Sequence, residues 1–185
     1  MGTIPTPATF VAGTSVGLTA QLNGLRDSIN FWANTPKCYA YQTVATSLTS
    51  GTTTVLPLGG ELYDIVQAGD TASHDNTTNS SRIVVRTAGK YQISGNVSFA
   101  TTTGTLTATV RKNAAGLNTG GTLVLSARSP AAAGISSILN LPGAVLDLAV
   151  GDYLELFASQ NSGSTVLTDA SGTQATWMSI WLVGS

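Results

Sequence analysis

Charged residues are scarce in this chain. Of its 185 residues only 9 % are Asp, Glu, Lys or Arg, and the formal net charge is −1. Soluble proteins usually carry ~25 % charged residues. A chain so weakly charged offers no basic patch to phosphate groups, so we predict no nucleic-acid partner. It also has little charge repulsion to keep its copies apart, which favours association.

Cysteine and histidine are nearly absent as well. Cys38 is the only cysteine, which excludes an internal disulfide and a cysteine-based metal site. His74 is the only histidine, and the chain has neither a G-x-S-x-G motif nor a metal-binding pair of histidines. A hydrolase needs a nucleophile, a base and an orienting group, so we predict a protein that is not an enzyme and holds no cofactor.

Long apolar runs are missing too. No run of ~20 apolar residues is present, so we expect no membrane span. The N-terminus lacks a basic region followed by an apolar core, so no signal peptide is predicted.

The stretch 89–100, GKYQISGNVSFA, shows what the chain has instead. Tyr91, Ile93, Val97 and Phe99 alternate with polar residues, which predicts a strand with one buried face. Gly95 keeps the spacing without a side chain and indicates a bulge or a close neighbour. The apolar run in 82–86 comes just before it, so the pattern predicts strand, tight turn, strand.

Similar short strands follow one another along the chain. The patterns predict a series of them, separated by turns, which is typical of an all-β sandwich or barrel. Besides the two above they cover 38–43, 53–56, 61–66, 105–111, 122–127, 135–141, 145–150, 153–158 and 174–183.

A different pattern precedes Pro36. Residues 1–15, rich in Pro and Thr, predict an extended arm. Apolar residues then recur at spacings of four, three, four and three, which is a heptad pattern on one helix face: Leu18, Leu22, Leu25, Ile29 and Trp32. The stripe either packs on its own domain or meets the same helix of other copies on a symmetry axis. We therefore divide the chain into 1–36, for attachment or oligomerisation, and a β domain, 37–185.

The β domain resembles the jelly-roll superfamily of tumour necrosis factor and complement globular heads. The matching pieces occur in the family's order and are ELYD at 61–64, RIVV at 82–85, GKYQI at 89–93, VSF at 97–99, ATVRKN at 108–113, LDLAVGDYLEL at 146–156 and MSIWL at 178–182. The resemblance implies an antiparallel jelly roll that forms homotrimers through aromatic and aliphatic faces.

The N-terminal segment resembles another group of proteins. TFVAGT at 9–14, TAQLN at 19–23 and RDSINF at 26–31 are similar to the openings of tail and virion-surface proteins of tailed bacteriophages. That resemblance implies a location on the surface of the virion head or tail. The expected partners are then other virion proteins, such as the major capsid or tail proteins.

Four aromatic residues of the β domain are candidates for subunit contacts. Trp177 and Trp181 lie four apart on the last strand and so share a face. Tyr91 and Phe99 are likewise an even number of residues apart in 89–100 and share a face of that strand. Aromatic residues are enriched at the cores of oligomer interfaces, but the core of a single domain is the more common position for them. Both interpretations stay open at this stage.

Polar loops provide the remaining candidates. Asp70, His74 and Asp75, with Glu61 and Asp64 nearby, form the only acidic cluster, and its spacing favours a solvated loop over a Ca²⁺ site. Loops 69–81, 113–121 and 161–172 are candidates for recognition of a host-surface glycan or protein. The chain is thus interpreted as a trimeric phage capsid-decoration or minor tail protein; the alternative is a receptor- or glycan-binding module of a tail fibre or tip.

Overall fold

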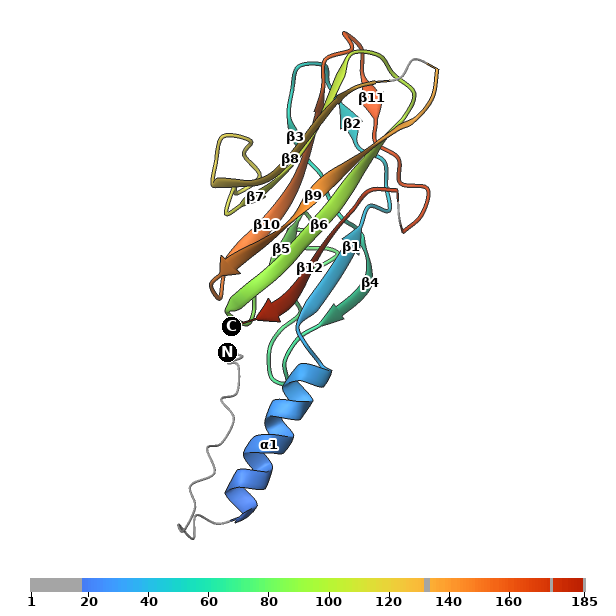
Figure 1. Cartoon of the computed structure of the whole chain (residues 1–185). Helices are drawn as coiled ribbons and strands as arrows, with labels where there is room; N and C mark the ends of the chain where they lie inside the picture. The colour runs from blue at the N-terminus through green and yellow to red at the C-terminus, as the bar shows by residue number, and fades with distance from the viewer. Residues whose placement is uncertain (1–17, 132–133, 174, 185) are drawn as a thin grey trace.

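The computed structural model of the chain describes residues 18–131, 134–173 and 175–184 (Figure 1). These residues form one helix and twelve strands. In chain order the elements are α1 (Leu18–Ala33), β1 (Lys37–Tyr41), β2 (Ser47–Leu48), β3 (Thr54–Val55), β4 (Gly60–Ile65), β5 (Arg82–Val84), β6 (Gly89–Phe99), β7 (Thr105–Lys112), β8 (Thr122–Pro130), β9 (Ser137–Leu148), β10 (Tyr153–Gln160), β11 (Val166–Leu167) and β12 (Trp177–Gly184).

Two antiparallel sheets make up the β domain. The five-stranded sheet has the order β4-β1-β12-β6-β9. The second sheet has the order β3-β10-β7-β8, and β5 pairs with β10 farther along the same strand. The short strands β2 and β11 form a separate pair. The predicted all-β sandwich is confirmed, and its architecture is a jelly roll preceded by one helix.

Strand β6 lies inside the five-stranded sheet, and its pattern is the one predicted. Tyr91, Ile93, Val97 and Phe99 are buried, as their alternation requires. A Cβ atom on Gly95 would lie 2.8 Å from the carbonyl oxygen of Trp177 on β12, so a side chain has no room there. The register with β9 also shifts between Ile93 and Gly95. Gly95 therefore marks both a close neighbour and a bulge.

One prediction about strand boundaries was wrong. The strands predicted at 135–141 and 145–150 form a single strand, β9, because Pro142 and Gly143 fall within the bulge opposite β6 and do not end the pairing. The strand, short turn and strand predicted over 82–100 are present as β5 and β6, but the two are not partners: β5 pairs with β10, whereas β6 pairs with β12 and β9. Alternation identifies a strand but does not identify its partner.

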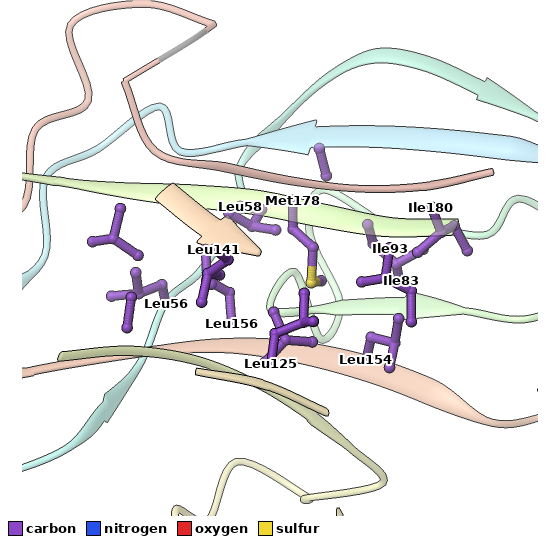
Figure 2. Packing of buried hydrophobic residues seen from close by; sticks show 14 of the residues in the cluster. Leu56, Leu58, Ile83, Ile93, Leu125, Leu141, Leu154, Leu156, Met178 and Ile180 are labelled. Carbon is purple, nitrogen blue, oxygen red and sulfur yellow. The ribbon is translucent and has the colours of Figure 1, made fainter. Parts of the chain in front are cut away.

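The hydrophobic core lies between the two sheets. Figure 2 shows Ile93, Leu141 and Met178 of the five-stranded sheet facing Leu125, Leu154 and Leu156 of the second sheet. Their side chains exclude water from both inner faces, and burial of such apolar area is the main stabilising contribution to a sandwich.

The helix is fixed to the β domain at its C-terminal end. Phe31 is 2 % exposed and belongs to the buried hydrophobic cluster. The side-chain amide of Gln67 donates a hydrogen bond to the carbonyl oxygen of Asn34 (2.9 Å) just after the helix. The rest of α1 projects away from the sandwich (Figure 1). It ends at Ala33, before Pro36, as predicted.

Candidate subunit interface

The two sheets present very different outer faces. In an antiparallel pair, residues directly opposite each other project from the same face of the sheet. Lys37 of β1 lies opposite Trp181 of β12, and Tyr39 lies opposite both Ser179 of β12 and Tyr63 of β4. The outer face of the five-stranded sheet therefore carries five aromatic side chains, which we call the aromatic face: Tyr39, Tyr41, Tyr63, Trp177 and Trp181.

These rings pack against one another and still expose apolar area. The ring of Tyr39 stacks on that of Trp177 with centroids 4.9 Å apart, and the centroid of Tyr63 is 5.8 Å away. The ammonium group of Lys37 lies 5.3 Å from the ring centroid of Trp181. Trp181 nevertheless remains 53 % exposed. An exposed group of aromatic rings is typical of an interaction surface.

The Tyr39 side chain in the aromatic face stays neutral over a wide pH range. Burial, followed by the proximity of Tyr63, raises the pKa of Tyr39 to about 12. Its hydroxyl group donates a hydrogen bond to the carbonyl oxygen of Thr173 (2.8 Å). A ring held in this way loses little conformational entropy when another surface covers it.

Strands β6 and β9 extend this surface with small polar and apolar side chains. The hydroxyl groups of Ser94 and Ser179 hydrogen-bond to each other across β6 and β12 (2.9 Å). Val145 of β9 lies opposite Gln92, on the same outer face, and is 52 % exposed. The two serines in the middle of the sheet thus hydrogen-bond to each other, with Val145 on one side of them and the aromatic rings on the other.

The outer face of the second sheet is mainly polar. Thr107 of β7 lies opposite Arg128 of β8, and Thr109 lies opposite Ser126. Leu123, next to a shift in register, is the exposed apolar residue of β8. Such a surface is suited to water, so the five-stranded sheet is the better candidate for contact between subunits.

The helix carries a second exposed apolar surface. Leu22, Leu25, Ile29 and Trp32 are 45–58 % exposed, and we call them, with Leu18, the helix stripe. Phe31, which anchors the helix, lies outside this stripe. The stripe is therefore not the surface that packs on the chain's own domain. The side chain of Leu18 is outside the described part of the structure, although its backbone begins the helix.

The four aromatic candidates lie in two different environments. Trp177 and Trp181 share the outer face, as their spacing predicted. Tyr91 and Phe99 are 1 % and 0 % exposed and belong to the subunit's own core, so neither offers a surface to another copy. Alternation along a strand could not separate the exposed tryptophans from the buried Tyr91 and Phe99, because it does not show which side of the sheet is covered by the second sheet. Tyr39, Tyr41 and Tyr63 were not identified as candidates from the sequence. Their alternate positions in 37–41 and 61–65 do show which of them share a face of their strand.

The side chain of His74 is buried and contacts polar groups through both ring nitrogens, so it does not lie in a solvated loop. It is 3 % exposed; its Nδ1 lies 2.9 Å from a carboxylate oxygen of Glu61, and its Nε2 lies 3.0 Å from the carbonyl oxygen of Ser80. Its backbone N–H donates to the carboxylate of Asp64, whose pKa is raised mainly by burial. Both ring nitrogens are occupied, so His74 holds the loop in place and is not available as a catalytic base.

Cys38, the single cysteine, also lies in the interior. Cys38 is fully buried, and burial, followed by the charges of Asp64 and Glu61, raises the pKa of its thiol. Within residues 18–131, 134–173 and 175–184, no group of three or more His, Cys, Asp and Glu side chains is placed to hold a metal ion. Over the same ranges, no helix has the length and apolar character needed to cross a bilayer.

Comparisons with known proteins identify the fold. No protein-family model matches the chain, and no curated protein matches its sequence. Solved structures that match include murine APRIL at pH 8.0 (TM-score 0.59, 13 % identity, 80 % of this chain and 98 % of that one). They also include the globular domain of a zebrafish complement 1qA protein (0.51, 15 %, 80 % and 97 %) and Eiger TNF from S. frugiperda (0.57, 11 %, 82 % and 94 %). The chain therefore has the jelly-roll fold of tumour necrosis factor-like and complement 1q-like globular domains.

Proposed function

We propose that this protein is a non-enzymatic structural protein that forms homotrimers on the surface of a tailed-phage virion, as a capsid-decoration or minor tail protein. The observation that carries the proposal is the aromatic face. It exposes Trp181 beside a cluster of packed rings, whereas the opposite outer face of the same sandwich is mainly polar. Covering one face with copies of the chain buries the apolar area and leaves the polar face in water.

The position of the helix supports the same arrangement. β1 begins at Lys37, only a few residues after α1, and Lys37 lies opposite Trp181 on the aromatic face. The helix stripe therefore starts where the aromatic face ends. Copies joined through the face bring their helices close to a common axis, where the stripes of Leu22, Leu25, Ile29 and Trp32 can pack together.

Attachment to the particle is assigned to the N-terminal arm. Residues 1–17 lie outside the described part of the structure, so this assignment rests on their composition and on the resemblance of the N-terminal segment to phage virion proteins. In this proposal the arm contacts a major capsid or tail protein, the aromatic faces join the copies, the helices pack together beside the axis, and the jelly rolls face outward.

The solution mass of the full chain tests the trimer. Light scattering is expected to give three times the chain mass of 18.8 kDa. Trp181→Glu is expected to shift the mass to that of the monomer, because it places a charge in the contact. Ser126→Glu, which adds the same group to an exposed position of β8 on the other outer face, is the matched control and should remain trimeric. A full chain that stays monomeric at high concentration contradicts the trimer.

The location is tested on purified virions. Antibody raised against the β domain is expected to label intact particles in electron microscopy, and label on the head or on the tail distinguishes the two placements. Particles assembled with a version of the protein that lacks residues 1–17 should lose the label if the arm is the attachment segment. Virions without label contradict the virion assignment and leave the trimer measurement unaffected.

A further inference from the structure

A polar hollow lies away from the aromatic face, where loop 69–81 folds over β5 and the start of β10. Its volume is about 220 Å³, and the residues that line it include Asp75, Thr78, Asn79, Arg82, Arg86 and Tyr153. We propose that this hollow binds a carboxylate-bearing sugar residue, such as the acidic unit of a surface glycan. The hollow is smaller than the ~300–1,000 Å³ typical of drug-sized ligands, which suits a single sugar ring. This inference does not depend on the proposed trimer.

Two guanidinium groups supply the positive side of the hollow. Nε of Arg82 donates to the carboxylate of Glu155 (3.0 Å), and its guanidinium carbon lies 4.3 Å from the ring centroid of Tyr153. Nε of Arg86 donates to the carbonyl oxygen of Ala72 (2.9 Å). The terminal nitrogens of both arginines make no hydrogen bond to any residue that the structure describes. Both groups are thus anchored through Nε and keep their paired terminal donors for a planar carboxylate.

Glu155 holds Arg82 in place without making the hollow neutral. It is 1 % exposed, and its second carboxylate oxygen accepts a hydrogen bond from the backbone N–H of Gly116 (2.9 Å). The carboxylate of Glu155 therefore interacts with the Gly116 amide and with Arg82, and it is not exposed in the hollow. Arg86 forms no ion pair within the described residues, so its charge is free to attract an anion.

Asp75 supplies the negative side and selects among anions. Its Oδ1 accepts hydrogen bonds from the backbone N–H groups of Thr77 and Thr78 and from the hydroxyl group of Thr77. These bonds lower the pKa of Asp75 to about 2, so it is ionised at ordinary pH. A phosphate dianion is repelled by this carboxylate. A carboxylate with neighbouring hydroxyl groups is favoured, because the hydroxyls can donate to Asp75 while the carboxylate pairs with Arg86.

The hollow is already organised before any ligand binds. His74 joins loop 69–81 to Glu61 and Asp64 of β4, and its backbone pairs with that of Ile83 in β5. Little ordering is therefore needed on binding. Arg82 and Tyr153 belong to the second sheet, so association through the aromatic face leaves the hollow open to solvent.

Titration calorimetry on the full chain at low salt tests the proposal. The probes are glucuronate, galacturonate and N-acetylneuraminate, with glucose, acetate and inorganic phosphate as comparisons. We expect at least one sugar acid to bind with a Kd of roughly 1 mM, and glucose, acetate and phosphate to bind at least about tenfold more weakly. Arg86→Gln should weaken the sugar acid by about tenfold or more. Arg128→Gln, which removes the same charge from β8, should leave its affinity unchanged.

A second variant tests the selecting role of Asp75. Asp75→Asn keeps an oxygen that can accept from the Thr77 and Thr78 amides but removes the charge, so phosphate should gain affinity relative to the sugar acid. Three results overturn the proposal: no binding of any sugar acid at about 20 mM, equal binding of acetate or phosphate by the unmodified protein, or equal loss of binding in Arg86→Gln and Arg128→Gln.

Discussion

The two outer faces of this sandwich follow the same alternation and have opposite chemistry. On the five-stranded sheet, the outward positions of β1 and β12 carry Tyr39, Trp177 and Trp181. On the second sheet, the outward positions of β7 and β8 carry Thr107, Ser126 and Arg128. Since both sheets contribute apolar inner faces to the core, the difference between the outer faces has no role in closing it.

The difference teaches how the chain divides its apolar side chains between folding and association. Inward residues such as Phe99 are covered by the second sheet, whereas Trp181 on the neighbouring strand is left half exposed. Neutral rings on one face and polar groups on the other produce a subunit with one side suited to its own copies.

The largest effect is expected from an inward aromatic residue. Phe99→Ala removes a fully buried ring and should lower the free energy of unfolding by about 3–5 kcal/mol, because it leaves a cavity between the sheets. Trp181→Ala should cost the isolated subunit less than about 1 kcal/mol, because much of its ring is already in water, while weakening association. Urea unfolding at a concentration where the chain is monomeric measures both. Equal losses contradict the distinction between the faces.

A buried charge on the second sheet should affect folding and not association. Glu155→Gln weakens the pairing with Arg82 and the bond from the Gly116 amide, and should cost about 1–3 kcal/mol of stability. The solution mass should not change, because Glu155 lies away from the aromatic face. Urea unfolding combined with light scattering makes the test, and a monomeric variant that remains folded would assign this sheet to the interface.

The helix stripe should contribute to association more weakly than the aromatic face. Ile29→Glu replaces a residue that is 58 % exposed in the subunit, and should raise the dissociation constant of the trimer by an amount equivalent to about 1–2 kcal/mol. Asn23→Glu, which adds the same charge off the stripe, is the control. Sedimentation over a range of concentrations measures the shift. Truncation at Lys37 is less informative, because it also removes Phe31 from the core.

The smallest effect is expected from acid. The pKa of Asp152 is lowered: burial raises it, but hydrogen bonds from Asn113, the Ala149 amide and Lys112 outweigh burial. A depressed folded-state pKa contributes stability that is present above the unfolded value of ~3.9 and is lost as the pH falls through the lower folded value. The urea midpoint of the unmodified protein should therefore fall more between about pH 5 and pH 3 than that of Asp152→Asn. Identical slopes contradict this contribution.

Much of the fold could be predicted because strand patterns are local. The alternation of Tyr91, Ile93, Val97 and Phe99 identified β6, and the heptad spacing before Pro36 identified α1. Pairing is not local, so the sequence showed neither that β9 continues past Pro142 nor that β5 pairs with β10. The residues of the hollow were predicted only in part: loop 69–81 was a candidate, but Arg82, Arg86 and Tyr153 were not, since no spacing relates them.

Periods of two and of three to four residues are properties of the backbone, so the residue pattern was enough to predict a sandwich of short strands behind an amphipathic helix. Which aromatic residues are core and which are surface depends on how the two sheets pack. Tyr91 and Trp181 belong to paired strands and have similar chemistry, yet the second sheet covers one and not the other. The same holds for Phe31, which anchors the helix, while the residues of the regular stripe remain exposed. Burial depends on what packs against a residue from elsewhere in the chain, and periodicity carries no information about that.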